Sequence, residues 1–184
     1  MYFKELRLSG AFEIELTPMS DNRGLFERLY CKEEFNKIGL TKEIVQINRS
    51  VNLFKGAFRG LHFQKPPYSE IKIVTCIKGA VSDFIVDLRK ESATFLQWLE
   101  INLNEENNKA IYIPEGFAHG FQTLKNSTEL LYFHTQLYKP EYESGINYND
   151  PLLKLNLPLK ISEISERDKI RPFLSNIERD LPEF

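Results

Sequence analysis

The chain has 184 residues, enough for one domain or for one domain with an extension. Its 42% hydrophobic and 27% charged residues are typical of globular proteins, and its formal net charge of −2 argues against a general nucleic-acid binder, which carries a basic surface. No stretch reaches the ~18 apolar residues of a membrane helix, and the charged N-terminus lacks the apolar core of a signal peptide.

Short segments of alternating or β-branched apolar residues, separated by turn residues, recur along the chain. The predicted strands are Phe12–Leu16, Glu43–Asn48, Phe58–Gln64, Ile71–Ile77, Ala80–Leu88, Phe95–Leu103, Ala110–Ile113 and Leu130–Leu137. A turn is predicted at Asp21–Gly24, and short helices at Lys32–Ile38 and from Ser162 to Arg167. Many short strands without a long amphipathic helix predict an all-β sandwich or barrel.

Polar side chains gather in the strand-like stretch from Phe58 to Gln64. If Arg59, His62 and Gln64 share one face, they form a polar cluster in a mostly apolar protein. Polar groups on a core-facing surface destabilise the fold unless they are paired, so the cluster indicates a functional site.

The chain has only three histidines, and two of them have unusual neighbours. His62 lies within the polar cluster. His119 ends the pattern Pro114-x-Gly116-x-x-His119, which resembles the second signature of the cupin double-stranded β-helix. His134 follows an aromatic pair without such a context and is interpreted as structural. A histidine in a strand is more often structural than catalytic, and only the context of the first two changes that expectation.

One possible chemistry is metal binding. A cupin metal site usually has a His-x-His pair, but this chain reads His62-Phe63-Gln64, which replaces one imidazole by a weak neutral ligand. Glu70 could complete a set of two histidines and one carboxylate, of the kind that binds iron. The missing histidine makes this the weaker interpretation.

The other possible chemistry is metal-free acid–base catalysis. A neutral histidine can remove a proton from a carbon beside a carbonyl group if a cation stabilises the enolate oxygen. Lys72 could be that cation, although a solvated strand lysine is an equally good interpretation. A tyrosine on the opposite side could return a proton with inversion. Tyr132 and Tyr138 both qualify, and periodicity alone does not choose between them.

Several linked motifs make the chain resemble the dTDP-4-dehydrorhamnose 3,5-epimerases, from about Phe12 to Asp168. The motifs are Asp21-x-Arg23-Gly24-x-Phe26, Gln46-x-Asn48-x-Ser50, Arg59-Gly60-Leu61-His62-Phe63-Gln64, Lys72-Ile73-Val74, Val86-Asp87-Leu88-Arg89, Ile113-Pro114-Glu115-Gly116-Phe117-Ala118-His119, Tyr132, Tyr138, Asn149-Asp150-Pro151 and Ser165-x-x-Asp168. Any one of these motifs is weak, but in this order they are specific.

The resemblance implies a cupin double-stranded β-helix, or jelly-roll barrel, with short C-terminal helices. One domain would span residues 1–184, with a core at about 12–150 and a C-terminal extension, 151–184, that contributes Asp168. It also implies a homodimer in which a strand from each subunit completes the other's sheet, and work in the cytoplasm without a metal or another cofactor. The two cysteines, Cys31 and Cys76, lie far apart and are expected to be free thiols.

The resemblance also implies roles for single residues. His62 would be the base, Asp168 its hydrogen-bond partner, Lys72 the cation for the enolate and Tyr132 the proton donor. The residues implied to hold the nucleotide-sugar, which is dTDP-linked by default, are Arg23, Phe26, Gln46, Asn48, Arg59, His119, Tyr138, Glu143 and Arg167. The implied reaction inverts C3 and C5 of dTDP-4-dehydro-6-deoxy-D-glucose and forms dTDP-4-dehydro-L-rhamnose.

Three positions depart from the family's usual pattern. Arg28 replaces a glutamate that contacts the nucleotide-sugar, Glu70 replaces a glutamine, and Leu157-Pro158 replaces a tryptophan-proline pair. The first departure leaves the identity of the nucleotide and the sugar open. Alternative functions are a C3-only or C5-only epimerase or a 3,4-ketoisomerase and, more distantly, a metal-dependent cupin or a sugar-binding module without catalysis.

Overall fold

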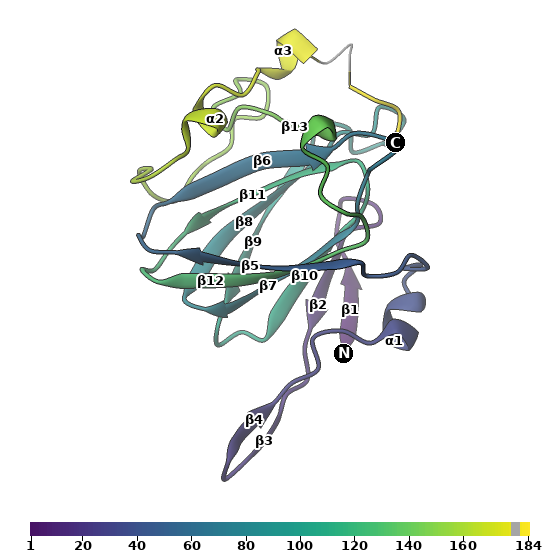
Figure 1. Ribbon diagram of the computed structural model, residues 1–184, viewed down its shortest axis with the longest axis vertical. Helices are drawn as coiled ribbons and strands as arrows, with labels where there is room; N and C mark the ends of the chain where they lie inside the picture. Colours follow the sequence, from purple (N-terminus) through teal and green to yellow (C-terminus); the bar gives the residue numbers. More distant parts are fainter. Residues whose placement is uncertain (178–180) are drawn as a thin grey trace.

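The computed structural model describes residues 1–177 and 181–184, which form two facing antiparallel sheets (Figure 1). The strands of the six-stranded sheet, in spatial order, are β1 (Tyr2–Glu5), β2 (Phe12–Glu15), β10 (Lys109–Ile113), β7 (Lys72–Lys78), β12 (Thr128–His134) and β5 (Gln46–Asn52). The strands of the five-stranded sheet are β13 (Glu143–Gly145), β6 (Phe58–Gln64), β11 (Phe117–Thr123), β8 (Ala80–Asp87) and β9 (Trp98–Asn104). The predicted all-β jelly roll is confirmed.

The hydrophobic core draws residues from both sheets, including Val74 of β7, Ile85 of β8 and Leu130 of β12. The outer faces are covered as well. Phe35 of helix α1 (Lys32–Asn36) packs on the six-stranded sheet, and Leu174 of helix α3 (Leu174–Ile177) packs on the five-stranded sheet. All five side chains are fully buried, and each contributes roughly 1.5–3 kcal/mol through removal from water.

Most of the predicted strands are observed within three residues of their predicted bounds. The sequence did not predict β1 or β11. All seven residues of β11 are buried, so this strand lacks the alternation of apolar and polar residues that a half-buried strand shows. The predicted helix at Lys32–Ile38 is confirmed as α1, and both cysteines are free as expected.

Two glycines bring the strands of His62 and His119 together. Gly60 has a φ of +136°, and a Cβ atom at this position would lie 2.5 Å from the Cα of Gly120. Only glycine fits such a close backbone approach. The register of β6 and β11 places His119 opposite His62, so the two imidazoles project from neighbouring positions.

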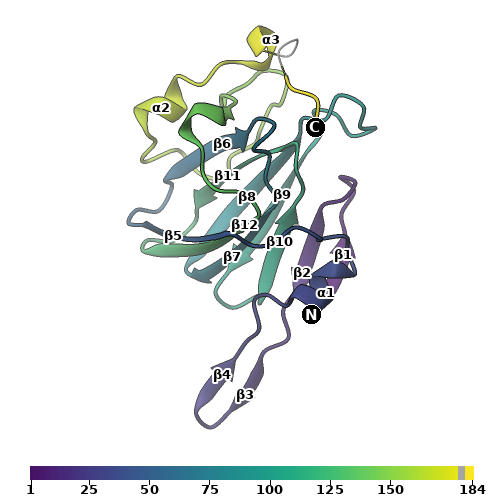
Figure 2. The same ribbon diagram turned by 45° about the vertical axis from the view of Figure 1, so that its right-hand side comes forward.

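A two-stranded arm extends away from the sheets in both views (Figures 1 and 2). It consists of β3 (Met19–Asp21) and β4 (Gly24–Phe26), joined by the predicted turn. Within this turn, the backbone N–H of Arg23 donates to Oδ1 of Asp21 at 2.8 Å. The arm therefore holds its shape through the turn, while its apolar side chains, such as Phe26 at 68% exposure, face outward.

The C-terminal segment covers the five-stranded sheet and carries α2 (Glu166–Lys169) and α3 (Figure 1). Asn147 holds this segment, because its amide nitrogen donates to the carbonyl oxygens of Lys169 at 2.9 Å and Arg171 at 3.0 Å. The short C-terminal helices were predicted, although α2 begins four residues after the predicted start. None of the described helices is long and apolar enough to cross a membrane.

Candidate functional site

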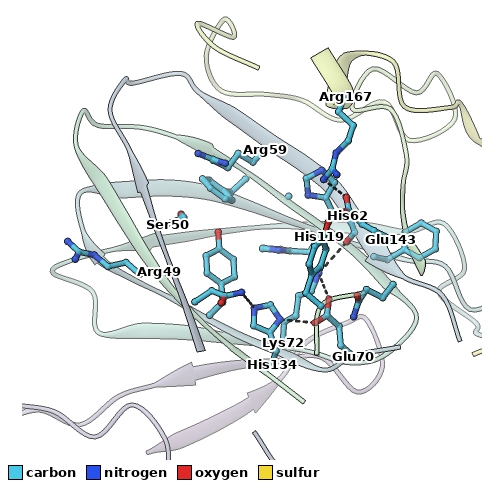
Figure 3. Close-up of a pocket in the computed structure, with 17 residues that line it drawn as sticks. Arg49, Ser50, Arg59, His62, Glu70, Lys72, His119, His134, Glu143 and Arg167 are labelled. Atoms are coloured by element: carbon cyan, nitrogen blue, oxygen red, sulfur yellow. Dashed lines mark hydrogen bonds and ion pairs between the residues drawn. The ribbon is translucent and has the colours of Figure 1, made fainter. Parts of the chain in front are cut away.

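A cavity of about 410 Å³ opens between the two sheets, with charged, polar and aromatic side chains in its walls (Figure 3). Thirteen residues were predicted to act in catalysis or binding. Nine of them line this cavity: Asn48, Arg59, His62, Lys72, His119, Tyr132, Tyr138, Glu143 and Arg167. They come from strands of both sheets and from the C-terminal segment, so the fold creates the site by bringing distant segments together.

Asp168 binds His62 from behind the cavity. Nε2 of His62 lies 2.6 Å from Oδ1 of Asp168, which is buried in α2. Burial raises the pKa of Asp168, but the hydrogen bond and charge of His62, with the N–H group of Gly60, bring it below the usual range. Because an ionised carboxylate only accepts hydrogen bonds, Nε2 of His62 carries a proton and Nδ1 is free to accept one.

Lys72 is buried beside the backbone of His62. Its Nζ donates to the carbonyl oxygen of His62 at 3.5 Å and lies 3.2 Å from Oε1 of Glu70. The side chains of Lys72 and Glu70 are only 11% and 9% exposed. The ammonium group is thus held between Glu70 and the backbone of His62, in the wall of the cavity that His62 also lines.

Tyr132 is half-buried between two histidine rings. It stacks on His134, with ring centroids 6.0 Å apart and planes inclined by 14°, and meets His119 edge-on at 6.2 Å. Burial raises the pKa of the Tyr132 phenol, although hydrogen bonding with Ser50 and the charge of Arg59 act in the opposite direction. The phenol is therefore protonated at neutral pH and can serve as a proton donor.

His119 forms a second pair with a carboxylate. Its Nε2 lies 2.8 Å from Oδ2 of Asp83, a residue with no exposed surface. Oδ1 of Asp83 has no hydrogen-bond partner among the described residues. Burial raises the pKa of Asp83, and the charges of His119 and Lys72 offset only part of this effect. The cupin signature predicted His119, but no sequence pattern indicated its carboxylate.

His134 forms the third such pair and also lines the cavity, although its sequence context predicted a structural residue. Its Nδ1 lies 2.7 Å from Oε2 of Glu70, and its Nε2 is 3.3 Å from the amide nitrogen of Asn48. The alternation of the last predicted strand already placed Tyr132 and His134 on one face. This alternation was the signal that could have identified His134 as a cavity residue. It was not decisive, because the neighbours of His134 in the sequence form no functional motif.

Glu143 organises the rim of the cavity. Its carboxylate accepts hydrogen bonds from the hydroxyl of Tyr138, from Arg167 at 2.6 Å and from Arg171. Burial raises the pKa of Glu143, but these partners and the charge of His62 bring it below the usual range. Tyr138 and Arg167 are consequently held at the rim while both remain exposed to a ligand.

Three predicted binding residues do not line the cavity of this chain. Gln46 lies next to the rim, where its Oε1 accepts a hydrogen bond from the backbone N–H of Tyr138 at 3.2 Å. Arg23 and Phe26 lie on the arm, outside the cavity. Arg28, the departure from the family pattern, donates to Glu34 at 2.8 Å.

Gln64 stands where a cupin metal site would have a second histidine, and its amide binds backbone groups. Its nitrogen donates to the carbonyl oxygens of Tyr68 and Leu137, and its oxygen accepts from the N–H of Lys139 at 2.7 Å. Gln64 therefore anchors two loops at the cavity. Within residues 1–177 and 181–184, no group of three or more histidine, cysteine, aspartate or glutamate side chains could hold a metal ion.

Comparisons with known proteins identify one family. The sequence model of a family described as dTDP-4-dehydrorhamnose 3,5-epimerase matches residues 5–176. A dTDP-4-dehydrorhamnose 3,5-epimerase of Methanothermobacter thermautotrophicus is 40% identical over 170 residues, which cover 91% of each chain. A dTDP-4-dehydrorhamnose 3-epimerase of Streptomyces niveus is 35% identical, with coverage of 92% of this chain and 82% of the relative. A similar solved structure is the crystal structure of a dTDP-6-deoxy-D-glucose-3,5-epimerase from Legionella pneumophila in complex with dTDP-4-keto-L-rhamnose. The two structures match with a TM-score of 0.94 and 34% sequence identity, over 100% of this chain and 98% of that chain.

Proposed function

The chain belongs to the dTDP-4-dehydrorhamnose 3,5-epimerase family, and we propose that it performs the family's reaction with His62 as the base and Tyr132 as the acid. The reaction inverts C3 and C5 of dTDP-4-dehydro-6-deoxy-D-glucose and gives dTDP-4-dehydro-L-rhamnose. The observation that carries the assignment is the 2.6 Å pairing of His62 with Asp168 in a cavity that Tyr132 also lines. We place this work in the cytoplasm, where nucleotide-sugars are made.

The C4 keto group of the substrate acidifies the C–H bonds of its two neighbours, C3 and C5. His62 takes the proton, the C–H electron pair forms a double bond to C4, and the keto oxygen becomes an enolate oxygen. Lys72, which is held beside the base, stabilises this negative charge. Tyr132 gives its proton to the opposite face of the carbon, so that a new C–H bond forms with inverted configuration.

Each inversion leaves His62 with one additional proton and Tyr132 with one fewer. Before the second carbon reacts, His62 must release its proton to water and Tyr132 must regain one from water. A second cavity, of about 620 Å³, shares His62, Arg59 and Arg167 with the first and is also lined by Asp168. It supports this step because His62 borders open space on a second side.

The rim of the cavity suits a nucleoside diphosphate. Arg59 and Arg167 are exposed guanidinium groups at the opening, and guanidinium binds phosphate oxygens through paired N–H donors. Tyr138 is 48% exposed and offers its ring as a stacking surface for the base or the sugar. Asn48 and His119 supply hydrogen-bonding groups deeper in the cavity.

The proposed reaction is tested by incubation of the protein with dTDP-4-dehydro-6-deoxy-D-glucose in D₂O without added metal. Deuterium is expected at both C3 and C5, with formation of the L-rhamno product, as followed by ¹H NMR. The variant His62→Ala, compared at equal folded concentration, should show no exchange. Absence of exchange in the wild type with every nucleotide-linked keto-sugar tested would overturn the enzyme assignment.

Inversion of one centre is the second candidate, because one relative of similar identity is named as a 3-epimerase. In that case deuterium would enter at C3 alone, and C5 would keep its proton and its configuration. The same NMR experiment separates the two outcomes, since the C3 and C5 protons give distinct signals.

We further infer that two copies form a dimer in which the arm of one copy reaches the cavity of the other. The side chain of Arg23 is 90% exposed and Phe26 is 68% exposed, and neither lines the cavity of its own chain. Strand β5 forms an edge of the six-stranded sheet and exposes Ile47 and Val51, and an apolar edge strand favours pairing with another chain.

Mixing of two inactive variants tests this dimer. In a mixed dimer of Arg23→Ala and His62→Ala copies, one of the two sites has both an intact arm and an intact base. Random exchange of subunits should therefore restore about a quarter of the wild-type activity. A monomer in sedimentation equilibrium, or no recovery after subunit exchange, would contradict the proposed arrangement.

A further inference from the structure

We propose that Glu70 and His134 are positioning residues for Lys72: Glu70 holds the ammonium group at the cavity wall, and His134 holds Glu70. This inference rests on the proposed function of Lys72. It assigns a role to two cavity residues that the proposed reaction does not use. Figure 3 shows Glu70 between Lys72 and His134, with a contact to each.

The two oxygens of Glu70 divide these contacts between them. Oε1 lies 3.2 Å from Nζ of Lys72, and Oε2 lies 2.7 Å from Nδ1 of His134. Among the described residues, Lys72 makes one further polar contact, with the carbonyl oxygen of His62 at 3.5 Å. The position of the ammonium group is thus defined by Glu70 on one side and by the backbone of the base on the other.

Burial favours a negative charge beside this ammonium group. The side chains of Glu70, Lys72 and His134 are 9%, 11% and 11% exposed, and an isolated ammonium group at that depth is unstable relative to its neutral form. Burial alone raises the pKa of Glu70, but the charge of Lys72 and the hydrogen bond of His134 lower it to about 2. Glu70 is therefore anionic over the whole range in which the enzyme works.

His134 fixes the orientation of Glu70. Because the anionic carboxylate only accepts hydrogen bonds, Nδ1 of His134 donates, and Nε2 is left to accept from the amide of Asn48 at 3.3 Å. The ring also stacks on Tyr132. Both nitrogens and one face of the imidazole are thus engaged, so His134 links Glu70 to strands β5 and β12.

The charges around Lys72 determine the effect of a substitution at Glu70. Besides Glu70, Asp83 interacts with the charge of Lys72, and His134 contacts Glu70. Burial raises the pKa of Asp83, so this residue compensates a cation less well than Glu70 does. Without the charge of Glu70, the protonated form of Lys72 is destabilised, and the lysine loses its proton at a lower pH than in the wild type.

The test compares Glu70→Gln with Glu115→Gln, which removes the same charge from a surface ion pair with Lys42. In Glu70→Gln, the alkaline limb of kcat should move down by about one pH unit or more, and kcat near neutral pH should fall about tenfold with little change in KM. Glu115→Gln should match the wild type. An alkaline limb of Glu70→Gln that coincides with that of the wild type would overturn the proposal.

A second pair of variants tests the same proposal if Glu70→Gln does not fold. His134→Gln keeps a donor for Glu70 and should retain most of the activity, whereas His134→Phe removes the donor and should reproduce the lower alkaline limb. Equal profiles for these two variants would also overturn the proposal.

A measurement independent of the reaction separates this proposal from the proposed function. In protein labelled with ¹³C at the lysine Cε, the resonance that disappears in Lys72→Met reports the protonation of Lys72. Its titration should move to lower pH in Glu70→Gln whether or not the substrate is correctly assigned. If Glu70→Gln leaves the titration of Lys72 unchanged, the positioning role of Glu70 is refuted, even if the wild type is an active epimerase. If the titration shifts as expected but the wild type is inactive, only the proposed function is refuted.

Discussion

The three histidines of the cavity each contact a carboxylate, but the surroundings of the carboxylates differ. Asp168 accepts a hydrogen bond from a protonated ring nitrogen and lies 3.4 Å from the N–H of Gly60, and its pKa is lowered. Glu70 lies beside Lys72, and its pKa is lowered to about 2. Asp83 is deeply buried with one oxygen lacking a described partner, and its pKa is raised. A pair of a histidine and a carboxylate can therefore act in catalysis, position another residue or form part of the buried structure.

Asp168→Asn should preserve the fold and slow deuterium exchange by ~10²–10⁴-fold, because the amide no longer fixes the protonated nitrogen of His62. The rate is measured by ¹H NMR in D₂O, and thermal unfolding is recorded for each variant. Glu166→Gln is the matched control, since Glu166 lies on the same helix with 84% of its side chain exposed. A wild-type exchange rate in Asp168→Asn would refute the role of Asp168.

Ser50→Ala should weaken the acid and leave the base intact. Loss of the hydroxyl removes a hydrogen bond that lowers the pKa of Tyr132, so the tyrosinate left after proton transfer becomes less stable. Inversion is expected to fall about tenfold or more, while His62 continues to exchange the substrate proton with solvent. The ratio of inversion to exchange measures this effect. Ser50→Thr retains the hydroxyl and should restore the ratio.

At the scale of single elements, α2 shows how a short helix is stabilised by its context. One turn of helix is unstable alone, and here Ser165 caps it by accepting a hydrogen bond from the N–H of Asp168 at 3.1 Å. Asn147 then fixes the chain that follows. Because Asp168 itself supplies the capped N–H group, the stability of this helix determines the position of the carboxylate behind His62.

Ser165→Ala should lower the free energy of unfolding by ~0.5–2 kcal/mol, the usual effect of losing an N-cap. It should also reduce kcat more than KM, because Asp168 becomes less well positioned. Urea denaturation and steady-state kinetics measure the two effects. Ser175→Ala, at an exposed position of α3, should change neither, and a reduced stability with an unchanged kcat would separate α2 from catalysis.

At the scale of the whole molecule, closure of the two sheets and the C-terminal segment buries charge. His62 and Asp168 are 106 residues apart in sequence, and Glu70 and His134 are 64 apart. The lowered pKa values of Glu70 and Asp168 mean that their ionised forms stabilise the folded protein. This stabilisation is fully present above the pKa values of the unfolded chain and is lost as the pH falls towards the folded values. Asp83, whose pKa is raised, acts in the opposite direction.

The free energy of unfolding should therefore fall as the pH is lowered from about 5 towards 2. Since the pKa of Glu70 falls from 4.5 to about 2, its share is on the order of 3 kcal/mol. Urea denaturation at several pH values measures the slope, which should be shallower in Glu70→Gln than in the wild type. An identical slope in this variant would show that the ionisation of Glu70 does not contribute.

Much of the sheet arrangement could be predicted, because the alternation along β12 and the apolar run of β8 are both typical of strands. Strand β11 could not, since its seven buried residues include histidine, glycine and glutamine, so it shows neither an alternation nor an apolar run. Nine of the thirteen expected site residues line the cavity, and Asp168 lies directly behind it. The partners of His119 and His134 could not be predicted, because their carboxylates come from other segments of the chain.

The stretch from Arg59 to Gln64 and the histidine at 119 already indicated the chemistry, because the sequence by itself determines which proton acceptors and cations are available. Only the tertiary structure decided which carboxylate binds each histidine, that His134 belongs to the cavity, and that Arg23 and Phe26 lie outside it. The physical reason is that hydrogen bonds and ion pairs act over a few ångströms between groups that are distant in the chain, and only folding brings those groups within that range.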